Sequence, residues 1–285
     1  MALRFAKMHG LGNDYIFVDG TRRKVAAPER LARTVSDRRF GVGSDGLIVV
    51  APSKAADFRM RMFNPDGSEA EMCGNGIRCL GKFVFENGLT RRRSITVETP
   101  GGIKTLELHV KGGRVQTVAV DMGPPQPVPT RFHRLADGNS RLVPVAVEAN
   151  GTRYEASVLS VGNPHCVIFV QDAKTFPVDV VGPMIERHAD FPSRTNTEFV
   201  SWIDERTLFQ RTWERGAGET FACGTGACAV AASLFLTERA KGRLLIKLRG
   251  GDLELEMRDG RLIMTGAASL VCEGELSAEL LSRKP

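Results

Sequence analysis

The chain has 285 residues, of which 42% are apolar and 25% charged, and its formal net charge is +6. This length allows one large domain or two ordinary ones, and this composition excludes a largely disordered protein. No apolar run approaches the ~20 residues that span a bilayer, and the N-terminal segment lacks a signal peptide's apolar stretch, so we expect a cytoplasmic protein without membrane contact. Aromatic residues are few and basic residues form only short clusters, so nucleic-acid binding is not expected.

In chain order, short runs rich in β-branched and aromatic residues predict a strand-rich fold. The expected strands are Tyr15–Val18, Leu47–Ala51, Phe58–Phe63, Ser94–Glu98, Lys104–Val110 and Thr117–Asp121, then Cys166–Val170, Glu198–Ile203, Leu208–Trp213, Leu244–Leu248, Leu253–Met257 and Leu262–Thr265. Two strongly apolar runs, Ile77–Glu86 and Ala227 to about Thr237, predict helices that lie inside a core.

The chain contains one pattern twice. The segment FNPDGSEAEMCGNGIRC contains Cys73, and the segment WERGAGETFACGTGAC contains Cys223, so the two cysteines lie 223 − 73 = 150 residues apart. The same offset relates Gly12-Asn13 to Gly162-Asn163, Arg61 to Arg211, Asn64 to Glu214 and Glu69 to Glu219. A shared offset over so many positions indicates two copies of one supersecondary unit.

The repeat predicts an α+β fold of two pseudo-symmetric domains, each with strands wrapped around a central apolar helix. The proline-rich stretch Gly123–Pro129 predicts an extended linker between them. The segment from about Ala268 has no counterpart in a simple tandem, so we expect it to return to the first domain as a strand. The predicted domains are residues 1–122 plus 268–285, and residues 123–267.

Each repeat places a cysteine at the predicted N-terminus of its buried helix. Such an end offers free N–H groups and a partial positive charge, which bind a carboxylate and lower the pKa of a nearby thiol. The glycines that follow each cysteine would leave room for an anion; they are Gly74, Gly76, Gly224 and Gly226. A thiolate and a thiol on opposite sides of one carbon can remove and return its proton. Cys73 and Cys223 are therefore the predicted acid and base of a racemase or epimerase.

Several other residues are considered as further members of the predicted site. His165 follows a turn equivalent to Gly12-Asn13-Asp14 of the first copy and is predicted to face the same cleft. No Cys-x-x-Cys occurs, so no zinc ribbon is predicted. Cys79, Cys228 and Cys272 are expected in the core. The repeat is asymmetric at Asn64 and Glu214, and at Tyr15 and His165, so we expect Glu214 and His165 to tune the two thiols.

At these positions the sequence resembles the diaminopimelate epimerases, over nearly the whole chain. The resemblance is carried by five motifs: MHGLGNDY from Met8, FNPDGSEAEMCGNGIRC from Phe63, GNPHC from Gly162, RTN from Arg194 and ERGAGETFACGTGAC from Glu214. The Cys-Gly-x-Gly pair alone would also suit proline racemases and hydroxyproline epimerases. The first and last motifs favour the diaminopimelate branch.

The resemblance implies interconversion of LL- and meso-diaminopimelate, in lysine and peptidoglycan precursor synthesis, without cofactor or metal. Cys73 and Cys223 would be proton donor and acceptor, with their pKa values adjusted by His165 and Glu214. The backbone at Gly74-Asn75 and Gly224-Thr225 would hold the α-carboxylate. The residues implied to line the substrate site are Asn13, Asn64, Asn163, Asn196, Glu214 and Arg215. The family also implies a homodimer.

The sequence differs from the family's pattern at two positions, and two alternative functions are also considered. Some family members carry Gln where this chain has Gly46, and some carry an aromatic residue at the dimer interface where this chain has Cys272. One rival is a proline or hydroxyproline racemase, although its site would be smaller and more apolar. The other is a non-enzymatic thiol sensor in which Cys73 and Cys223 form a reversible disulfide.

Overall fold

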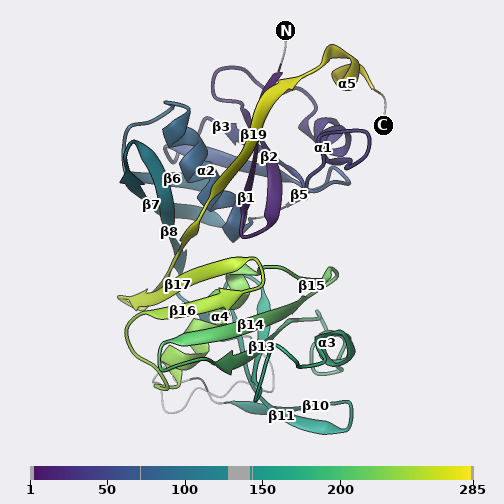
Figure 1. The fold of residues 1–285 in the computed structure, drawn as a ribbon, viewed down its shortest axis with the longest axis vertical. Helices are drawn as coiled ribbons and strands as arrows, with labels where there is room; N and C mark the ends of the chain where they lie inside the picture. Colours follow the sequence, from purple (N-terminus) through teal and green to yellow (C-terminus); the bar gives the residue numbers. More distant parts are fainter. Residues whose placement is uncertain (1–2, 71, 128–141, 143, 284–285) are drawn as a thin grey trace. The chain divides into compact units, whose positions relative to one another are not determined.

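The computed structural model describes residues 3–70, 72–127, 142 and 144–283. The chain divides into two units, one of Met1–Val120 with Gly266–Pro285 and the other of Asp121–Thr265. Each unit is built from a mixed sheet with helices packed against it (Figure 1). No helix in the described ranges is long and apolar enough to cross a membrane.

The first unit contains the elements up to β8 and the two last elements of the chain. They are β1 Leu3–Gly10, β2 Asn13–Asp19, α1 Pro28–Ser36, β3 Leu47–Ala51, β4 Phe58–Phe63, β5 Glu69–Ala70, α2 Gly74–Glu86, β6 Ser94–Thr99, β7 Gly102–Lys111, β8 Arg114–Gly123, β19 Ser269–Leu276 and α5 Ala278–Ser282. The strand order is β19, β1, β2, β3, β4, β6, β7, β8, and β5 pairs with β4. Neighbours are antiparallel except for the parallel pairs β2–β3 and β4–β6.

The second unit repeats this topology. Its elements are β9 Gln126–Pro127, β10 Val145–Ala149, β11 Thr152–Ser160, β12 Pro164–Phe169, α3 Val178–Glu186, β13 Asn196–Trp202, β14 Thr207–Glu214, β15 Gly218–Thr220, α4 Gly224–Leu236, β16 Leu244–Leu248, β17 Gly251–Arg258 and β18 Arg261–Ala267. The strands β11, β12, β13, β14, β16 and β17 follow one another, again with two parallel pairs, β12–β13 and β14–β16. The expected α+β fold with an internal repeat is confirmed.

The helices keep the offset of the sequence repeat. The first residues of α1 and α3 are 178 − 28 = 150 apart, and those of α2 and α4 are 224 − 74 = 150 apart. Even an ion pair is duplicated, because Arg61 binds Glu69 in the first unit and Arg211 binds Glu219 in the second, each through two side-chain hydrogen bonds. The duplication therefore extends from the backbone to individual side chains.

Each sheet is covered by a helix on either side. Helix α2 packs against β1, β2 and β7, and α4 packs against β11, β12, β13 and β17, while α1 and α3 pack on β3 and β14. Successive side chains of a strand point to opposite faces of the sheet, so one strand packs against the helices on both sides. In β2, Ile16 and Val18 join the core with α1, whereas the ring of Phe17 stacks on Phe83 of α2, with centroids 5.8 Å apart.

The two central helices differ in polarity, which corrects one expectation. Helix α2 was expected to be strongly apolar, but its Arg78 is fully buried and its Lys82 is nearly so. The Lys82 ammonium donates to Glu86 and to the carbonyl of Val115, which satisfies it inside the unit. Helix α4 has only small or apolar side chains along its buried length, as the sequence predicts.

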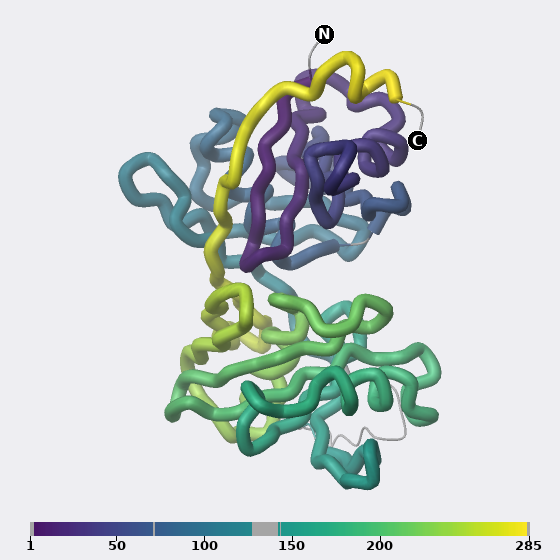
Figure 2. The backbone as a smooth tube through the Cα atoms, turned by 45° about the vertical axis from the view of Figure 1, so that its right-hand side comes forward, coloured from purple at the N-terminus to yellow at the C-terminus, as the bar shows by residue number. Residues whose placement is uncertain are grey.

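The end of the chain returns to the first unit as strand β19, antiparallel to β1, and the two strands lie side by side in Figures 1 and 2. Cys272 on β19 is exposed, so its assignment to the core is wrong. The reason is that Leu270, Val271 and Cys272 lie along a strand whose side chains are mostly open to solvent. Of the predicted linker, Gln126–Pro127 pairs with β11, and Val128 and Pro129 lie outside the described residues.

Candidate active site

Both candidate cysteines cap the central helix of their unit. Cys73 precedes α2 with an extended backbone, and its Sγ accepts a hydrogen bond from the Gly76 amide at 3.5 Å. Cys223 precedes α4 in the same conformation and accepts from the Gly226 amide at 3.4 Å. Each sulfur therefore takes the place that a Ser or Asp side chain takes at an ordinary helix start. Both cysteines are free thiols.

Cys73 lies in a polar setting built by β2 and α2. Its Sγ is 3.2 Å from Asn13 Oδ1, and the hydroxyl of the buried Tyr15 is hydrogen-bonded to it. Asn13 is itself held in place, because its amide group donates to Asp45 at 2.8 Å. Asp45 in turn receives a hydrogen bond from Arg38, so this network fixes the orientation of Asn13.

Arg78 is a buried cation one helical turn behind Cys73, and the sequence analysis did not single it out. Its guanidinium donates to the Gly74 carbonyl at 3.0 Å and to Asn75 Oδ1 at 2.8 Å. These bonds hold the first turn of α2, which includes the predicted carboxylate-binding backbone at Gly74-Asn75. The signal was present in the sequence, since an Arg inside an otherwise apolar helix needs buried partners.

The helix ends act to lower the two thiol pKa values, as expected, but burial raises both by more. Burial raises the pKa of Cys73, although the amides of Gly76 and Asn75, the Tyr15 hydroxyl and the Arg78 charge all act to lower it. Burial raises the pKa of Cys223 further, and the carboxylates of Glu214 and Glu198 add to this. The helix end does lower each thiol pKa, but in this structure desolvation is the larger effect.

Glu214 lies at the end of β14, next to Cys223. Its Oε1 accepts from the Thr220 hydroxyl at 2.5 Å, and its carboxylate is hydrogen-bonded to Cys223. Burial and then the nearby Glu198 raise the pKa of Glu214, while Thr220, His165 and Cys223 act against this. Thr225 adds a contact of 3.5 Å between its hydroxyl and the Cys223 sulfur. The structure therefore brings together Glu214, Cys223 and Thr225.

His165 is fully buried on β12, between two oxygen atoms. Its Nδ1 lies 2.8 Å from Glu198 Oε1, and its Nε2 lies 2.9 Å from Asn163 Oδ1. The adjacent Cys166 belongs to the core with α3, so the two side chains point to opposite faces of the strand. Glu198 was expected only as a strand residue, and sequence reasoning missed its contact with His165.

The remaining predicted site residues lie where strands begin or end: Asn196 is the first residue of β13, and Arg215 and Asn64 directly follow β14 and β4. In the second unit, Asn196 uses both ends of its amide, donating to the Pro164 carbonyl and accepting from the Arg215 backbone. The exposed Arg215 side chain donates to the Ser193 carbonyl at 3.0 Å. In the first unit, Asn64 is half-buried in the turn between β4 and β5 and donates to the Ser68 hydroxyl.

At two of the predicted anion-site positions, glycine is required for a different reason. A Cβ at Gly76 would lie 2.7 Å from Ile48 Cδ1, and a Cβ at Gly226 would lie 2.6 Å from Glu198 Oε1. Both glycines therefore let the first turn of the helix lie directly on the sheet, and the idea that they open a path for an anion is wrong at these two positions.

Close packing also explains the glycine at position 46, where some family members carry Gln. A Cβ there would lie 2.3 Å from the Phe63 carbonyl oxygen, so this backbone leaves no room for a side chain. The Gly46 carbonyl accepts from the Ile16 amide and from the Ser44 hydroxyl. The backbone therefore makes contacts inside the unit at this position.

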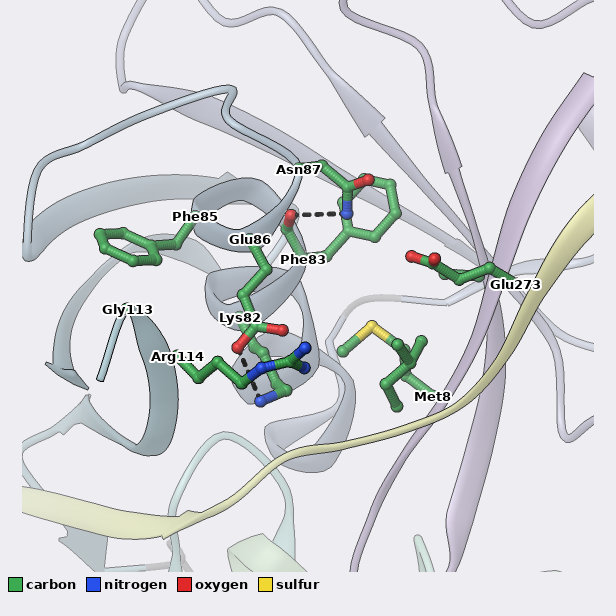
Figure 3. A pocket seen from close by; sticks show the side chains of 11 residues that line it. Met8, Lys82, Phe83, Phe85, Glu86, Asn87, Gly113, Arg114 and Glu273 are labelled. Carbon is green, nitrogen blue, oxygen red and sulfur yellow. Dashed lines mark hydrogen bonds and ion pairs between the residues drawn. The ribbon is translucent and has the colours of Figure 1, made fainter. Parts of the chain in front are cut away.

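A cavity of about 320 Å³ in the first unit is separate from these residues (Figure 3). It lies at the other end of α2, beside Phe83, Glu86 and Asn87, and its polar groups include the Lys82–Glu86 pair. Its lining contains none of the predicted site residues. Among the described residues no group of three or more His, Cys, Asp or Glu side chains could hold a metal ion.

Comparisons with known proteins decide the family. A family model described as diaminopimelate epimerase matches residues 5–128 and 157–271. A diaminopimelate epimerase of Acetivibrio thermocellus is 50% identical over 277 residues, covering 96% of this chain and 98% of its own. Another, from Methanococcus maripaludis strain C5, is 47% identical over 282 residues, covering 96% and 99%. The chain belongs to the diaminopimelate epimerase family. The resemblance seen in the five sequence motifs is thereby confirmed.

Solved structures of low sequence identity share the fold of this chain. A probable proline racemase from Agrobacterium radiobacter has a TM-score of 0.70 at 15% identity, covering 97% of this chain and 93% of its own. A phenazine biosynthesis protein of the PhzF family from Bacillus anthracis has a TM-score of 0.69 at 20% identity, covering 97% and 99%. At these identities the likeness shows a shared fold.

Proposed function

We propose that this protein interconverts LL- and meso-diaminopimelate, a step of lysine and peptidoglycan precursor synthesis, with Cys73 and Cys223 as proton donor and acceptor. The observation that carries the proposal is the pair of repeat-equivalent thiols that cap the two central helices. Family membership names the substrate. The proline racemase is similar in fold alone, at 15% identity, so it gives no support to proline as substrate.

The reaction needs only the two sulfur atoms as proton carriers. One thiolate takes the proton from the α-carbon, and the electron pair of the broken C–H bond is held by the adjacent carboxylate. The opposite thiol then gives its proton to the other face of the carbon, and it becomes the thiolate. Protons balance without a cofactor or metal, and the next turnover in reverse uses the same pair with exchanged roles.

The substrate would be bound by polar groups at the ends of both sheets. The backbone amides at Gly74-Asn75 and Gly224-Thr225 suit the α-carboxylate, because helix N-termini stabilise anions. We assign substrate contacts to Asn13, Asn64, Asn163, Glu214 and Arg215. Both ends of the Asn196 amide are engaged within the second unit, so we assign it the role of fixing Arg215.

We also propose that the protein works in the cytoplasm as a homodimer. Strand β19 exposes Leu270 and Val271 beside Cys272, and a second copy could cover this apolar strip. Light scattering after size-exclusion chromatography measures the mass directly, and a mass near 31.1 kDa at micromolar concentration would contradict the dimer.

The function is tested with LL-diaminopimelate in deuterated water. We expect proton NMR to show loss of the α-proton signal and appearance of the meso isomer, and no exchange with L-proline under the same conditions. Reductant is kept present so that both thiols stay free. Exchange of proline, or no exchange of either amino acid by folded protein, would contradict the proposal.

A further inference from the structure

The two units differ beneath the first turn of their central helices. In the first unit, the nearest side chains to Gly76 are Ile48 and Met60. In the second unit, the nearest side chains to Gly226 are Glu198 and Gln210. These are repeat-equivalent positions, since 198 − 48 = 210 − 60 = 226 − 76 = 150. An apolar pair in one copy is therefore replaced by a polar pair directly behind the cysteine of the other.

The Glu198 side chain is buried at a position where a charged carboxylate costs free energy of desolvation. Its side chain has 0% exposure, and its Oε2 has no hydrogen-bond partner among the described residues. Desolvating a carboxylate costs several kcal/mol in a real protein, which an ion pair of good geometry offsets only in part. The apolar counterpart Ile48 shows that the scaffold is compatible with a hydrophobic residue at this position. A role in function explains why a carboxylate stands there.

The contacts of Glu198 lead through His165 to Asn163. Glu198 Oε1 is 2.8 Å from His165 Nδ1, and His165 Nε2 is 2.9 Å from Asn163 Oδ1. Both atoms that flank the ring are oxygens, an arrangement in which a ring with a proton on each nitrogen would donate to both. A carboxylate on one side would stabilise such a doubly protonated ring. The Asn163 carbonyl is thereby engaged, and its NH₂ group has no partner among the described residues.

We propose that Glu198 is a positioning residue of the epimerase: it holds His165 so that the ring takes up the Asn163 oxygen and leaves the Asn163 NH₂ group free for the substrate. This rests on the proposed function for its substrate, but the relay of three residues lies wholly within the second unit. The ionisable groups around the ring are Glu198 from β13, Glu214 at the end of β14, and Cys166 on β12. Cys223 is close enough for both carboxylates to affect it.

The first test is Glu198→Gln, which keeps the shape and removes the charge. Its amide oxygen can accept from His165 Nδ1–H, so a neutral ring is left with Nε2 as an acceptor, and the Asn163 NH₂ group would turn to donate to it. We expect ¹⁵N NMR of histidine-labelled protein to show two protonated ring nitrogens for His165 in the wild type and one in the variant. His165→Asn assigns the signal. We also expect kcat for LL-diaminopimelate to fall by about 10–100-fold, the scale of a small misplacement in the site.

Gln210→Met is the matched control, because it restores the first unit's residue beside Gly226 without touching His165. We expect it to keep kcat and the His165 signals of the wild type. Glu198→Ile, the other first-unit residue, should lose activity like Glu198→Gln.

The proposal is overturned if wild-type His165 has one unprotonated nitrogen, if Glu198→Gln keeps wild-type kcat, or if Gln210→Met loses as much activity as Glu198→Gln. The ring signals are read without substrate, so a wrong substrate would leave the NMR result standing and fail only in the kinetics.

Discussion

The surroundings of Cys73 and Cys223 have the same backbone and different charges. Near Cys73 the helix carries the buried cation Arg78, and its repeat-equivalent position, 78 + 150, is Cys228. Near Cys223 the sheet carries Glu198, where the first unit has Ile48. The cation acts to lower the pKa of Cys73, whereas the carboxylates raise that of Cys223.

This comparison shows how a duplicated scaffold supplies two thiols of unlike acidity. The helix start, the glycine that packs on the sheet and the extended cap are common to both copies. Side chains beneath and beside the helix then separate the two acidities, as pairs of titratable groups do in many active sites. We expect Cys73 to ionise at lower pH than Cys223 and so to be the thiolate of the resting enzyme.

The largest effect should come from removing either sulfur. We expect Cys73→Ala and Cys223→Ala each to reduce epimerisation by more than about 10³-fold, since each removes one proton carrier. Each variant should still exchange the α-proton of one diaminopimelate isomer, because one face of the carbon keeps its base. Proton NMR of each isomer in deuterated water measures this. Wild-type exchange of both isomers by Cys73→Ala would exclude Cys73.

Glu214→Gln sharpens the comparison on the Cys223 side. The Glu214 charge, after burial, raises the pKa of Cys223, so its removal lowers that pKa. The thiol then loses its proton at lower pH, and the alkaline limb of the kcat profile should move to lower pH. We expect kcat to fall by about 10²-fold. If KM rises while the pH profile of kcat stays unchanged, Glu214 only binds the substrate's ammonium group.

Much of the fold could be predicted because the repeat doubled the evidence. The strands Leu47–Ala51, Phe58–Phe63 and Leu244–Leu248 occur with the predicted bounds. Helices α1 and α3 were not predicted. Helix α1 is short and has only one apolar stripe, and α3 contains Pro183 and exposes Val180 and Met184, so neither gave a clear pattern.

The sequence predicted which residues form the candidate site, but it did not predict which other side chains contact them. Cys73 and Cys223 could be placed at helix starts because glycines and an apolar run follow each. The partners Arg78 and Glu198 could not be placed, because their contacts depend on which strand lies under the helix. The raised thiol pKa values depend on burial, which motif spacing does not report.

Tyr15→Phe tests the Cys73 side with a smaller change. The Tyr15 hydroxyl donates to the Cys73 sulfur and acts to lower its pKa against burial, so the variant should have a higher thiol pKa. In a Cys223→Ala background, we expect alkylation of Cys73 by iodoacetamide near pH 8 to slow by about three- to tenfold. Mass spectrometry of the Cys73 peptide separates it from the exposed Cys272. Tyr154→Phe, which changes the chain's other tyrosine, should leave the rate unchanged.

The smallest effect concerns a thiol with no proposed part in catalysis. Burial raises the pKa of Cys79 to about 12, whereas an unfolded cysteine titrates near ~8.5. Between these values the folded state binds the proton more tightly, so the stability from this group is complete below about pH 8.5 and is lost as pH rises towards 12. Each such thiol should reduce the free energy of unfolding by about 1.4 kcal/mol per pH unit in that range. Urea titrations from pH 8 to pH 10 should therefore show a shallower loss of stability for Cys79→Ala than for the wild type, even though the variant is less stable at pH 8. Equal slopes would show that Cys79 does not keep its proton in the folded protein over this pH range.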